Sequence, residues 1–383
     1  MSSVSPHLCS LPPLSLYIHV PWCVRKCPYC DFNSHAHSGE LPEQAYLAAL
    51  LSDLEHEALR VHGRPIETVF IGGGTPSLMS PEFFRDLFRG LGQRLTFTDD
   101  AEITLEANPG TVEQGRFLGF REAGINRLSI GIQSFDPVQL RTLGRIHDAD
   151  AAHRAVEAAL AAGFNNFNLD LMHGLPGQTP EAAVADLEAA LAWRPPHLSW
   201  YQLTLEPNTE FYSRPPVLPD DDRLSDIYDA GAKTLRDGGY TDYEVSAWSR
   251  PGKASRHNLN YWRFGDYLAL GAGAHGKTTH RDGTVERYWK TRQPEAYLNR
   301  IGNYVAGTQL VSHDELPLEY MMNVLRLSEG VPETMYTELT GLPLDSIAAI
   351  LQRLRTENLL HPGRIQATEQ GKRYLNSLLE RFL

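Results

Sequence analysis

Short apolar runs alternate with longer amphipathic segments over the first 240 residues of the chain. Six of these runs have the length and β-branched content of buried strands, and turn residues bound them. They lie at Leu14–Val20, Glu67–Gly74, Glu102–Asn108, Arg127–Ser134, Asn166–Gly174 and His197–Thr204. Strands that alternate with helices pair in parallel, because each helix carries the chain back across the sheet and covers it. The pattern therefore predicts an α/β fold with a partial (β/α)6 barrel over residues 14–240.

Helical periodicity fills the segments between the predicted strands. Two of the segments open with a hydroxyl residue before a proline, Ser80 before Pro81 and Thr179 before Pro180. This order is a helix start signal, because the hydroxyl caps the helix and proline suits its first position. We predict helices over Gln44–Arg60, Pro81–Leu91, Val112–Ala123, Ala149–Ala162 and Pro180–Trp193.

The chain changes character after residue 204. The proline-rich stretch Leu205–Asp222 predicts a long ordered loop, and a helix, a strand-like run at Tyr240–Arg250 and the polar-aromatic segment Arg256–Trp262 follow it. We assign a mixed extension to residues 241–307 and a C-terminal helical domain to residues 308–383. The helices predicted in this domain, before a short hairpin and a last helix, lie at Glu315–Ser328, Glu333–Leu339 and Asp345–Glu357. This order is typical of a winged helix.

Charge and hydropathy narrow the class of protein. The 35 Lys and Arg residues against 47 Asp and Glu residues leave a formal net charge of −12. An acidic chain is a poor ligand for nucleic acid, and residues 331–383 carry six basic and six acidic residues. We therefore expect no nucleic-acid partner, and a C-terminal domain that packs as a lid or binds a protein. No apolar run is long enough to span a membrane and no basic leader is evident, so we expect a cytoplasmic protein.

Three of the four cysteines, Cys23, Cys27 and Cys30, lie within eight residues, directly after the first predicted strand. Parallel barrels place their chemistry at the carboxyl ends of the strands. Three thiolates on one loop can hold three irons of a [4Fe-4S] cluster and leave the fourth iron open to a small molecule. Arg25 and Lys26, between the cysteines, favour the thiolate form.

Two alternatives remain open for this loop. A structural zinc ion needs four ligands, and Cys9 or His19 could supply the fourth, which would make the chain a zinc-stapled interaction module. Cys9 could also close the iron-sulfur cluster, although its place before the first strand favours a free thiol.

Polar residues stand at the ends of successive predicted strands, where a shared ligand would meet them. The Asp170 carboxylate can accept hydrogen bonds from ribose hydroxyls, and Gln133 or Arg145 can donate hydrogen bonds to a carboxylate. The alternatives are structural: a satisfied polar pair for Glu106 and Asp170, and a strand-end cap for Gln133. The strand-end residues are Gly72, Gly73, Gly74, Thr75, Glu106, Gln133 and Asp170.

The Cys-x3-Cys-x2-Cys loop, with YIHVPW before it and GGGTP after the second strand, resembles the radical S-adenosylmethionine (SAM) superfamily. More narrowly, YIHVPWCVRKCPYCDFNS, IGGGTPS, IGIQSF and HNLNYW resemble the oxygen-independent coproporphyrinogen oxidase group. The resemblance implies a barrel of the radical SAM type and a [4Fe-4S] cluster on the three cysteines. It also implies that exchangeable SAM binds at Tyr17, Tyr29, Gly74, Thr75, Glu106, Gln133, Arg145 and Asp170.

Two differences separate the chain from the oxidases of that group. The oxidases carry a further cysteine two residues past the third ligand, where this chain has Phe32, and a longer N-terminal arm. The resemblance therefore implies a haem chaperone that transfers haem to an acceptor protein. Oxidative decarboxylation of coproporphyrinogen III is the alternative. Cleavage of SAM, the electron donor, the haem acceptor and homodimer formation are left open.

Two histidines beyond the barrel are candidates for holding haem. Imidazole is a common axial ligand of haem iron, and Tyr and Trp can line a flat apolar pocket. His257 lies in the segment RHNLNYW and His275 in the glycine-rich segment GAGAHG. The alternative for each is a hydrogen-bonded structural histidine.

Overall fold

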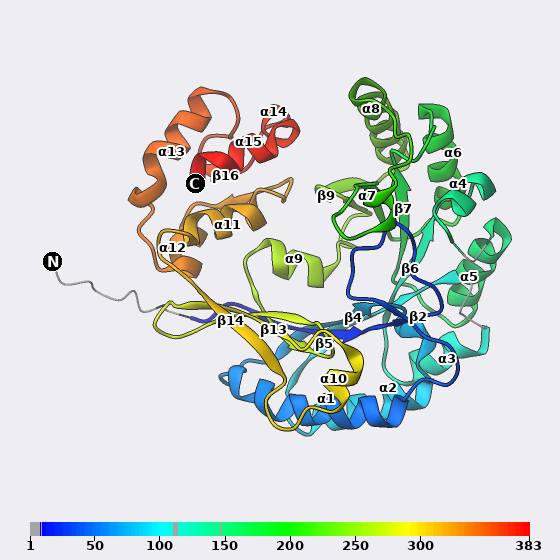
Figure 1. Cartoon of the computed structure of the whole chain (residues 1–383). Helices are drawn as coiled ribbons and strands as arrows, with labels where there is room; N and C mark the ends of the chain where they lie inside the picture. The colour runs from blue at the N-terminus through cyan, green and yellow to red at the C-terminus, as the bar shows by residue number, and fades with distance from the viewer. Residues whose placement is uncertain (1–7, 9, 110–113, 146–147) are drawn as a thin grey trace.

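In the computed structural model of the chain, the described residues are 8, 10–109, 114–145 and 148–383. Six neighbouring strands run parallel at the centre of one sheet (Figure 1). Helices cover the outer side of the curved sheet, and this explains why the strands are apolar along most of their length. The predicted α/β fold with six parallel strands is confirmed. The strands are β1 (Leu14–Val20), β4 (Ile66–Gly73), β5 (Phe97–Ala107), β6 (Arg127–Gln133), β7 (Phe167–His173) and β8 (His197–Gln202).

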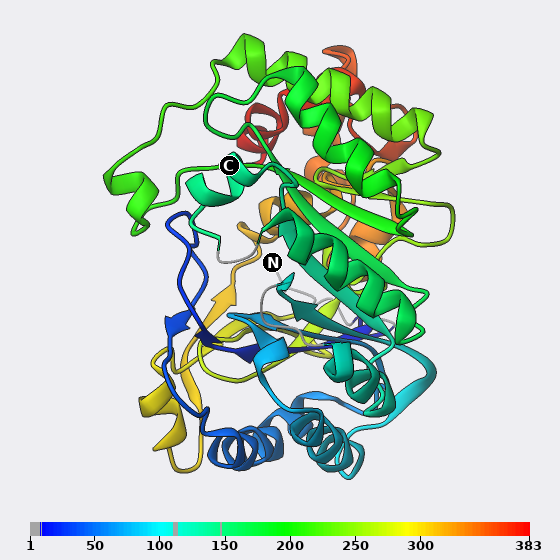
Figure 2. The same ribbon diagram turned by 90° about the vertical axis from the view of Figure 1, so that its right-hand side faces the viewer.

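The crossover helices agree with the predicted ones to within a few residues. Ser80 Oγ accepts a hydrogen bond from Phe83 N, and Thr179 Oγ1 accepts one from Ala182 N, as the start signals predict. Val112, the predicted start of the third helix, lies outside the described residues. The helices are α1 (Glu43–Glu57), α2 (Pro81–Gly92), α3 (Gln114–Glu122), α4 (Pro137–Thr142), α5 (Ala149–Ala161), α6 (Pro180–Leu191), α7 (Glu210–Ser213) and α8 (Asp221–Asp237). Figure 2 shows them along the outside of the sheet.

The residues after α8 extend this sheet at both edges. The run Tyr240–Arg250, predicted as one strand, forms two short antiparallel strands beside β8, namely β9 (Thr241–Glu244) and β10 (Ala247–Ser249). At the other edge β11 (Asp266–Leu270) pairs in parallel with β1. The strands β12 (His275–Thr279), β13 (Val285–Lys290) and β14 (Val305–Val311) then continue antiparallel. The helix α9 (Arg256–Trp262) packs against β1, β4 and β11, and α10 (Pro294–Leu298) packs against α1.

Buried ion pairs join this extension to the barrel. Lys290 Nζ lies 2.5 Å from Asp53 Oδ1 and 2.6 Å from Glu57 Oε1, and all three side chains are fully buried. Lys277 Nζ lies 3.0 Å from Asp266 Oδ1 in a second buried pair. Burial raises the pKa of Asp53 to about 6, against the attraction of Lys290. The loss of one partner would leave an uncompensated charge in the interior, so the Lys290 pairs hold β13 to α1, whereas the Lys277 pair joins β12 to β11 within the extension.

The C-terminal residues form a helical unit with its own apolar core, centred on Tyr320, Tyr336 and Leu354. An antiparallel bridge between Leu360 and Ala367 supplies the predicted hairpin, and Val331 pairs with Ile365 across the two helices between them. The C-terminal helical, winged-helix-like domain is therefore as predicted. Its elements are α11 (Leu316–Val324), β15 (Val331–Pro332), α12 (Thr334–Thr340), α13 (Asp345–Thr356), β16 (Arg364–Ile365), α14 (Glu369–Arg373) and α15 (Leu375–Leu379). Figure 1 shows these helices in orange and red, on the inner side of the sheet near α9.

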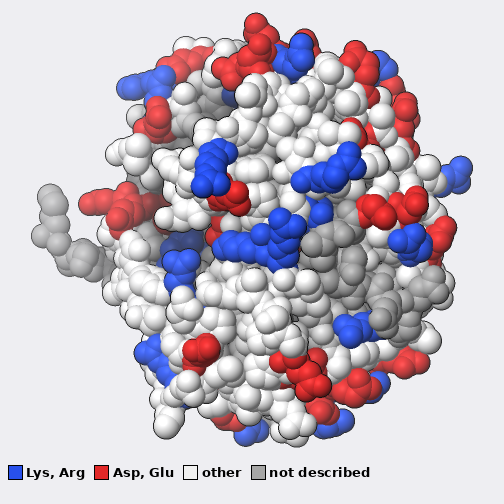
Figure 3. All heavy atoms as spheres, turned by 45° about the vertical axis from the view of Figure 1, so that its right-hand side comes forward, with Lys and Arg blue, Asp and Glu red and all other residues white. Residues whose placement is uncertain are grey.

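Two surface properties bear on function. None of the helices in the described part of the chain is both long enough and apolar enough to traverse a bilayer. Lys and Arg side chains gather near the middle of the face drawn in Figure 3, while most Asp and Glu side chains on that face lie toward its rim. The acidic net charge is therefore unevenly spread.

Candidate functional site

The three clustered cysteines lie on a loop that is closed at its base by a short parallel pairing. Here β2 (Trp22–Cys23) pairs with β3 (His35–Ala36), directly after β1. All three thiols are free, Cys23 buried and Cys27 and Cys30 half-buried. The loop therefore presents its sulfur atoms at the carboxyl end of the parallel strands, where the sequence places them.

Each cysteine sulfur lies beside a polar side chain. Thr75 Oγ1 lies 3.6 Å from Cys23 Sγ, Ser34 Oγ lies 3.5 Å from Cys30 Sγ, and Arg145 Nη1 lies 3.6 Å from Cys27 Sγ. Burial raises the pKa of the Cys23 thiol, and the Thr75 hydroxyl opposes the shift. The arginine and hydroxyl donors are suited to stabilising thiolate sulfur, because each offers a hydrogen to its lone pairs.

One cavity of about 420 Å³, which we call the barrel chamber, brings most of the predicted site residues together. They come from the loops and strand ends that follow β1, β4, β5, β6 and β7, which are far apart in the sequence and adjacent in the sheet. The predicted residues that line the barrel chamber are Cys23, Cys27, Cys30, Tyr29, Gly74, Thr75, Glu106, Gln133, Arg145 and Asp170.

The donor set suits a group held at several points better than a single ion. Within the part of the chain that is described, no three His, Cys, Asp or Glu side chains are close enough together to hold one metal ion. The three sulfurs line a common cavity without converging on a point, as a cluster with one iron per cysteine requires. Of the two residues considered as a fourth zinc ligand, His19 already uses both ring nitrogens in hydrogen bonds, to Asn33 O and to the Tyr17 hydroxyl. Cys9 lies outside the described residues.

Two glycines let the cysteine loop pack on the end of β4. A Cβ atom at Gly74 would lie 2.5 Å from Trp22 O, and one at Gly73 would lie 2.5 Å from the His19 ring. Gly73 also has φ +114°, a conformation that side chains disfavour. The close approach allows Gly74 N to donate to Val20 O and Thr75 N to donate to Trp22 O, both at 2.7 Å. The glycines thus fix the loop to the sheet.

Glu106 and Asp170 form a buried acidic pair beneath the cysteines. Glu106 Oε2 accepts from Gly73 N at 3.0 Å, whereas Asp170 accepts from Ser129 Oγ at 3.1 Å and from Asn168 Nδ2 at 2.7 Å. Burial, and then the charge of Asp170, raise the pKa of Glu106 to about 8. Burial also raises the pKa of Asp170, but its hydrogen bonds oppose the shift. With a pKa of about 8, Glu106 therefore offers a protonated carboxyl group to a polar ligand near neutral pH.

Gln133 and Arg145 are held in place by residues that the sequence did not single out. Gln133 has φ +74° at an irregularity in the pairing of β6 with β7, and its Oε1 accepts from Tyr201 Oη at 2.6 Å. Arg145 Nη2 donates to Asn108 Oδ1 at 2.6 Å and to Gly131 O at 2.7 Å. Asn108 and Tyr201 also line the chamber. Their places at the ends of predicted strands were the only sequence signal for them.

Three predicted residues do not line the barrel chamber. Tyr17 is half-buried on β1, with its hydroxyl 3.0 Å from His19 Nδ1. His257 is buried, with Nδ1 2.7 Å from Thr68 Oγ1, and burial lowers its pKa to about 3. His275 is exposed at the start of β12, beside the Trp289 ring. The structure therefore places His257 and His275 apart from the cysteines, although the neighbours of His257 on α9 reach the chamber.

The chamber is also lined by Asn258 and Trp262 from the segment RHNLNYW, and by Glu244, Ser246 and Arg326, which the sequence did not indicate. Arg326 comes from the turn after α11, so the C-terminal domain supplies part of the wall. No local pattern pointed to Glu244, Ser246 or Arg326, because they meet α9 only when the extension and the C-terminal domain pack together.

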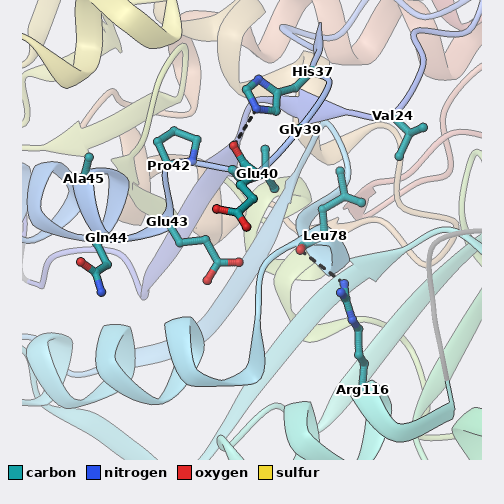
Figure 4. Close-up of a pocket in the computed structure, with 11 residues that line it drawn as sticks. Val24, His37, Gly39, Glu40, Pro42, Glu43, Gln44, Ala45, Leu78 and Arg116 are labelled. Carbon is teal, nitrogen blue, oxygen red and sulfur yellow. Dashed lines mark hydrogen bonds between the residues drawn. The ribbon is translucent and has the colours of Figure 1, made fainter.

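A second cavity, of about 610 Å³, lies beside the cysteine loop and contains none of the predicted site residues. Figure 4 shows Val24 at one side, Arg116 at another and the start of α1 along its edge. His37 Nε2 lies 3.0 Å from Glu40 O, and Arg116 Nη1 donates to Leu78 O at 3.4 Å. These polar groups are occupied by backbone contacts, so the barrel chamber is the better candidate site.

Comparisons with known proteins agree with this choice. Residues 17–190 match the Radical SAM superfamily, and residues 311–374 match the HemN C-terminal domain. The chain is 52% identical to the heme chaperone HemW of Escherichia coli (strain K12), over 97% of this chain and 99% of that protein. It is 37% identical to the mouse mitochondrial radical S-adenosyl methionine domain-containing protein 1, over 77% of this chain and 68% of that protein.

A solved structure shows the same fold. Coproporphyrinogen III oxidase (HemN) from Escherichia coli superimposes with a TM-score of 0.82 at 24% sequence identity, covering 97% of this chain and 90% of that chain. The likeness extends through the barrel, the added strands and the C-terminal helices.

Proposed function

The chain belongs to the HemW family within the radical SAM superfamily, and from this premise we propose that it is a haem chaperone. It binds haem and transfers it to an acceptor protein, and it carries a [4Fe-4S] cluster with exchangeable SAM. The observation that carries the proposal is the 52% identity to a heme chaperone HemW along 97% of the chain. The identity covers the cysteine loop, the strand ends and the C-terminal domain together. We place its action in the cytoplasm.

The cysteine end of the barrel chamber is the proposed cofactor site. Cys23, Cys27 and Cys30 would hold the cluster, which when bound supplies an electron and one iron without a protein ligand. Arg145 beside Cys27 offsets the negative charge of thiolate sulfur. Seven chamber residues and the half-buried Tyr17 are proposed to hold or orient SAM: Tyr17, Tyr29, Gly74, Thr75, Glu106, Gln133, Arg145 and Asp170.

The two carboxyl groups, those of Asp170 and Glu106, have different proposed roles. Asp170, held by Ser129 and Asn168, is positioned to accept hydrogen bonds from ligand hydroxyls. Glu106 keeps its proton near neutral pH, because burial and Asp170 raise its pKa to about 8. A neutral Glu106 adds no second negative charge to the chamber, which a sulfonium ligand and an anionic cluster must share.

Haem binding is proposed because the chain belongs to the HemW family. The candidate axial ligands of the haem iron are His257 and His275. Burial lowers the pKa of His257 to about 3, and partial desolvation together with the charges of Arg292 and Arg287 lowers that of His275, so both are neutral imidazoles near neutral pH. Neutral imidazole is the form that binds iron. His257 Nε2 is buried without a hydrogen-bond partner among the described residues, so this nitrogen is chemically free for a ligand once α9 moves.

Anaerobic titration of the reconstituted full-length protein with haem tests the proposal. We expect a Soret shift that saturates at a defined stoichiometry, followed by loss of the bound spectrum when an apo-haem protein is added as acceptor. Substitution of His257 or of His275 by Ala should shift the Soret band if that side chain binds the iron. The absence of a Soret shift with the unmodified protein would rule out a haem chaperone.

The same preparation tests the alternative reaction. The likeness to coproporphyrinogen III oxidase shows a shared fold, and Phe32 occupies the position of the further cysteine of the oxidases. Phe32 is 61% exposed and lines the chamber. We expect no protoporphyrinogen when coproporphyrinogen III, SAM and a reductant are supplied, and its formation would overturn the chaperone assignment.

A further inference from the structure

The end of the barrel chamber away from the cysteines is assembled from three separate segments. Glu244 ends β9, Trp262 ends α9, and Arg326 follows α11 in the C-terminal domain. We call this the C-terminal end of the chamber. It is lined by a positive, an acidic and an aromatic side chain, so its chemistry differs from that of the cysteine end.

Arg326 is held rigidly in this wall. Its guanidinium carbon lies 4.4 Å from the centre of the Trp262 ring, a stacked cation–π contact. Its Nη2 donates to Glu244 Oε2 at 3.2 Å. The side chain is 29% exposed, so a part of the guanidinium reaches open space while the rest is fixed.

The donors of Arg326 exceed the acceptors that surround it. A guanidinium carries five N–H donors, and among the described residues its one ion-pair partner is Glu244. Its Nε is buried without a hydrogen-bond partner in the described part of the chain, and so is the indole Nε1 of Trp262. Two neighbouring groups therefore leave N–H donors unused, which favours an acceptor ligand at this end.

Glu244 accepts from only one nitrogen of Arg326, Nη2, and so leaves the other donors without a partner among the residues described. It is only 3% exposed, and its Oε1 already accepts from Ser246 N at 3.1 Å while its Oε2 accepts from Arg326. Arginine can bind a second carboxylate at another edge of its planar fork. The remaining edge of Arg326 is thus open to a carboxylate that enters through the chamber.

We propose that Arg326, oriented by Trp262 and Glu244, binds a carboxylate of the ligand that occupies the C-terminal end of the chamber. The inference rests on the proposed function, which makes that carboxylate a propionate group of haem. The C-terminal domain then acts as a binding wall, and haem affinity depends on its packing against the barrel.

Haem and haem dimethyl ester, in which both carboxylates are masked, provide the test. Titrated anaerobically into the full-length protein, haem should bind about 10- to 100-fold more tightly than the ester, the range for a charge-assisted hydrogen bond. In Arg326→Gln the affinity for haem should fall to that for the ester, and the affinity for the ester should change less than about twofold.

Two further variants separate ligand binding from a merely structural role. Glu244→Gln removes the negative charge but keeps an amide oxygen that can accept from Arg326, so it should keep the preference for haem over the ester, which Arg326→Gln loses. Arg263→Gln removes the exposed arginine next to Trp262 that does not line the chamber, and should bind haem and its ester as the unmodified protein does.

Three results would contradict the inference in different ways. Equal affinity of the unmodified protein for haem and for the ester would show that no carboxylate is recognised. Equal weakening of haem and ester in both Arg326→Gln and Glu244→Gln would show that the pair only fastens the C-terminal domain. Binding of neither compound to the unmodified protein would overturn the proposed function and the inference with it.

Discussion

The two ends of the barrel chamber are built in different ways. At the cysteine end the side chains follow parallel strands that are neighbours in the sheet, and most of their polar atoms are already bonded to one another. At the C-terminal end, Trp262 and Arg326 are brought together only by domain packing, and each keeps an unused N–H donor within the described structure. The cysteine end also has one such donor, Arg145 Nε, but its other polar side chains are already fixed, which fits a resident cofactor there and an exchanged ligand at the C-terminal end.

Cys27→Ser should have the largest effect, because it should prevent the cysteine end from holding the cluster. Because the serine hydroxyl is a poor ligand for cluster iron, we expect iron and labile sulfide to fall to background and the dithionite-reduced paramagnetic resonance signal to disappear. Cys9→Ser is the matched control, since the proposed ligand set of the cluster does not include Cys9. A normal signal from Cys27→Ser, or its loss from Cys9→Ser, would show that the ligand set is wrong.

Lys290→Met tests a region that belongs to neither end. The substitution leaves Asp53 and Glu57 buried without their cation, which should lower the free energy of unfolding by about 3–5 kcal/mol. Lys233→Met, which removes an exposed lysine paired with Asp237, should lower it by less than about 0.5 kcal/mol. Chemical denaturation compares the two, and similar losses would mean that the buried pair contributes no more than a surface pair.

Glu106→Gln tests the raised pKa of Glu106 through the pH dependence of the free energy of unfolding. The pKa of Glu106 lies above its ordinary value in the folded protein, so its contribution to stability is lost as pH rises from that value through about 8. Glutamine does not ionise and escapes this loss. The variant should therefore gain stability relative to the unmodified protein by up to about 1.4 kcal/mol per pH unit over that range.

Urea unfolding of both proteins at about pH 5 and about pH 8 measures this difference. Other ionisable groups cancel when the two proteins are compared at the same pH. A stability difference that stays constant with pH would mean that Glu106 is ionised in the folded protein.

Tyr201→Phe should have the smallest effect, confined to the cysteine end. It removes the hydroxyl that holds Gln133 Oε1 at 2.6 Å, a net hydrogen bond of about 1 kcal/mol, and so should weaken SAM about fivefold. Calorimetric titration with SAM checks this, with the exposed Tyr212→Phe as control. Haem affinity should be unchanged, and a comparable loss of haem affinity would show that the two ends are coupled.

Much of the barrel could be predicted because its signals are local. The strand Leu14–Val20 was predicted with the bounds that β1 has, and the caps at Ser80 and Thr179 form as their residue types require. The cysteine end was largely predictable for the same reason, since strand order alone brings successive strand ends to one edge. Long-range pairings such as that of β11 with β1 leave no local signal, because the partners lie some 250 residues apart.

The sequence by itself determined which residues form parallel strands, where the cysteines stand and which polar groups share their edge, because periodicity and spacing act over a few residues. Only the tertiary structure decided that Tyr17 and His257 stay outside the lining of the chamber and that Arg326 enters its wall. Burial and contact between distant segments depend on how three parts of the chain pack together. That packing is a property of the whole fold.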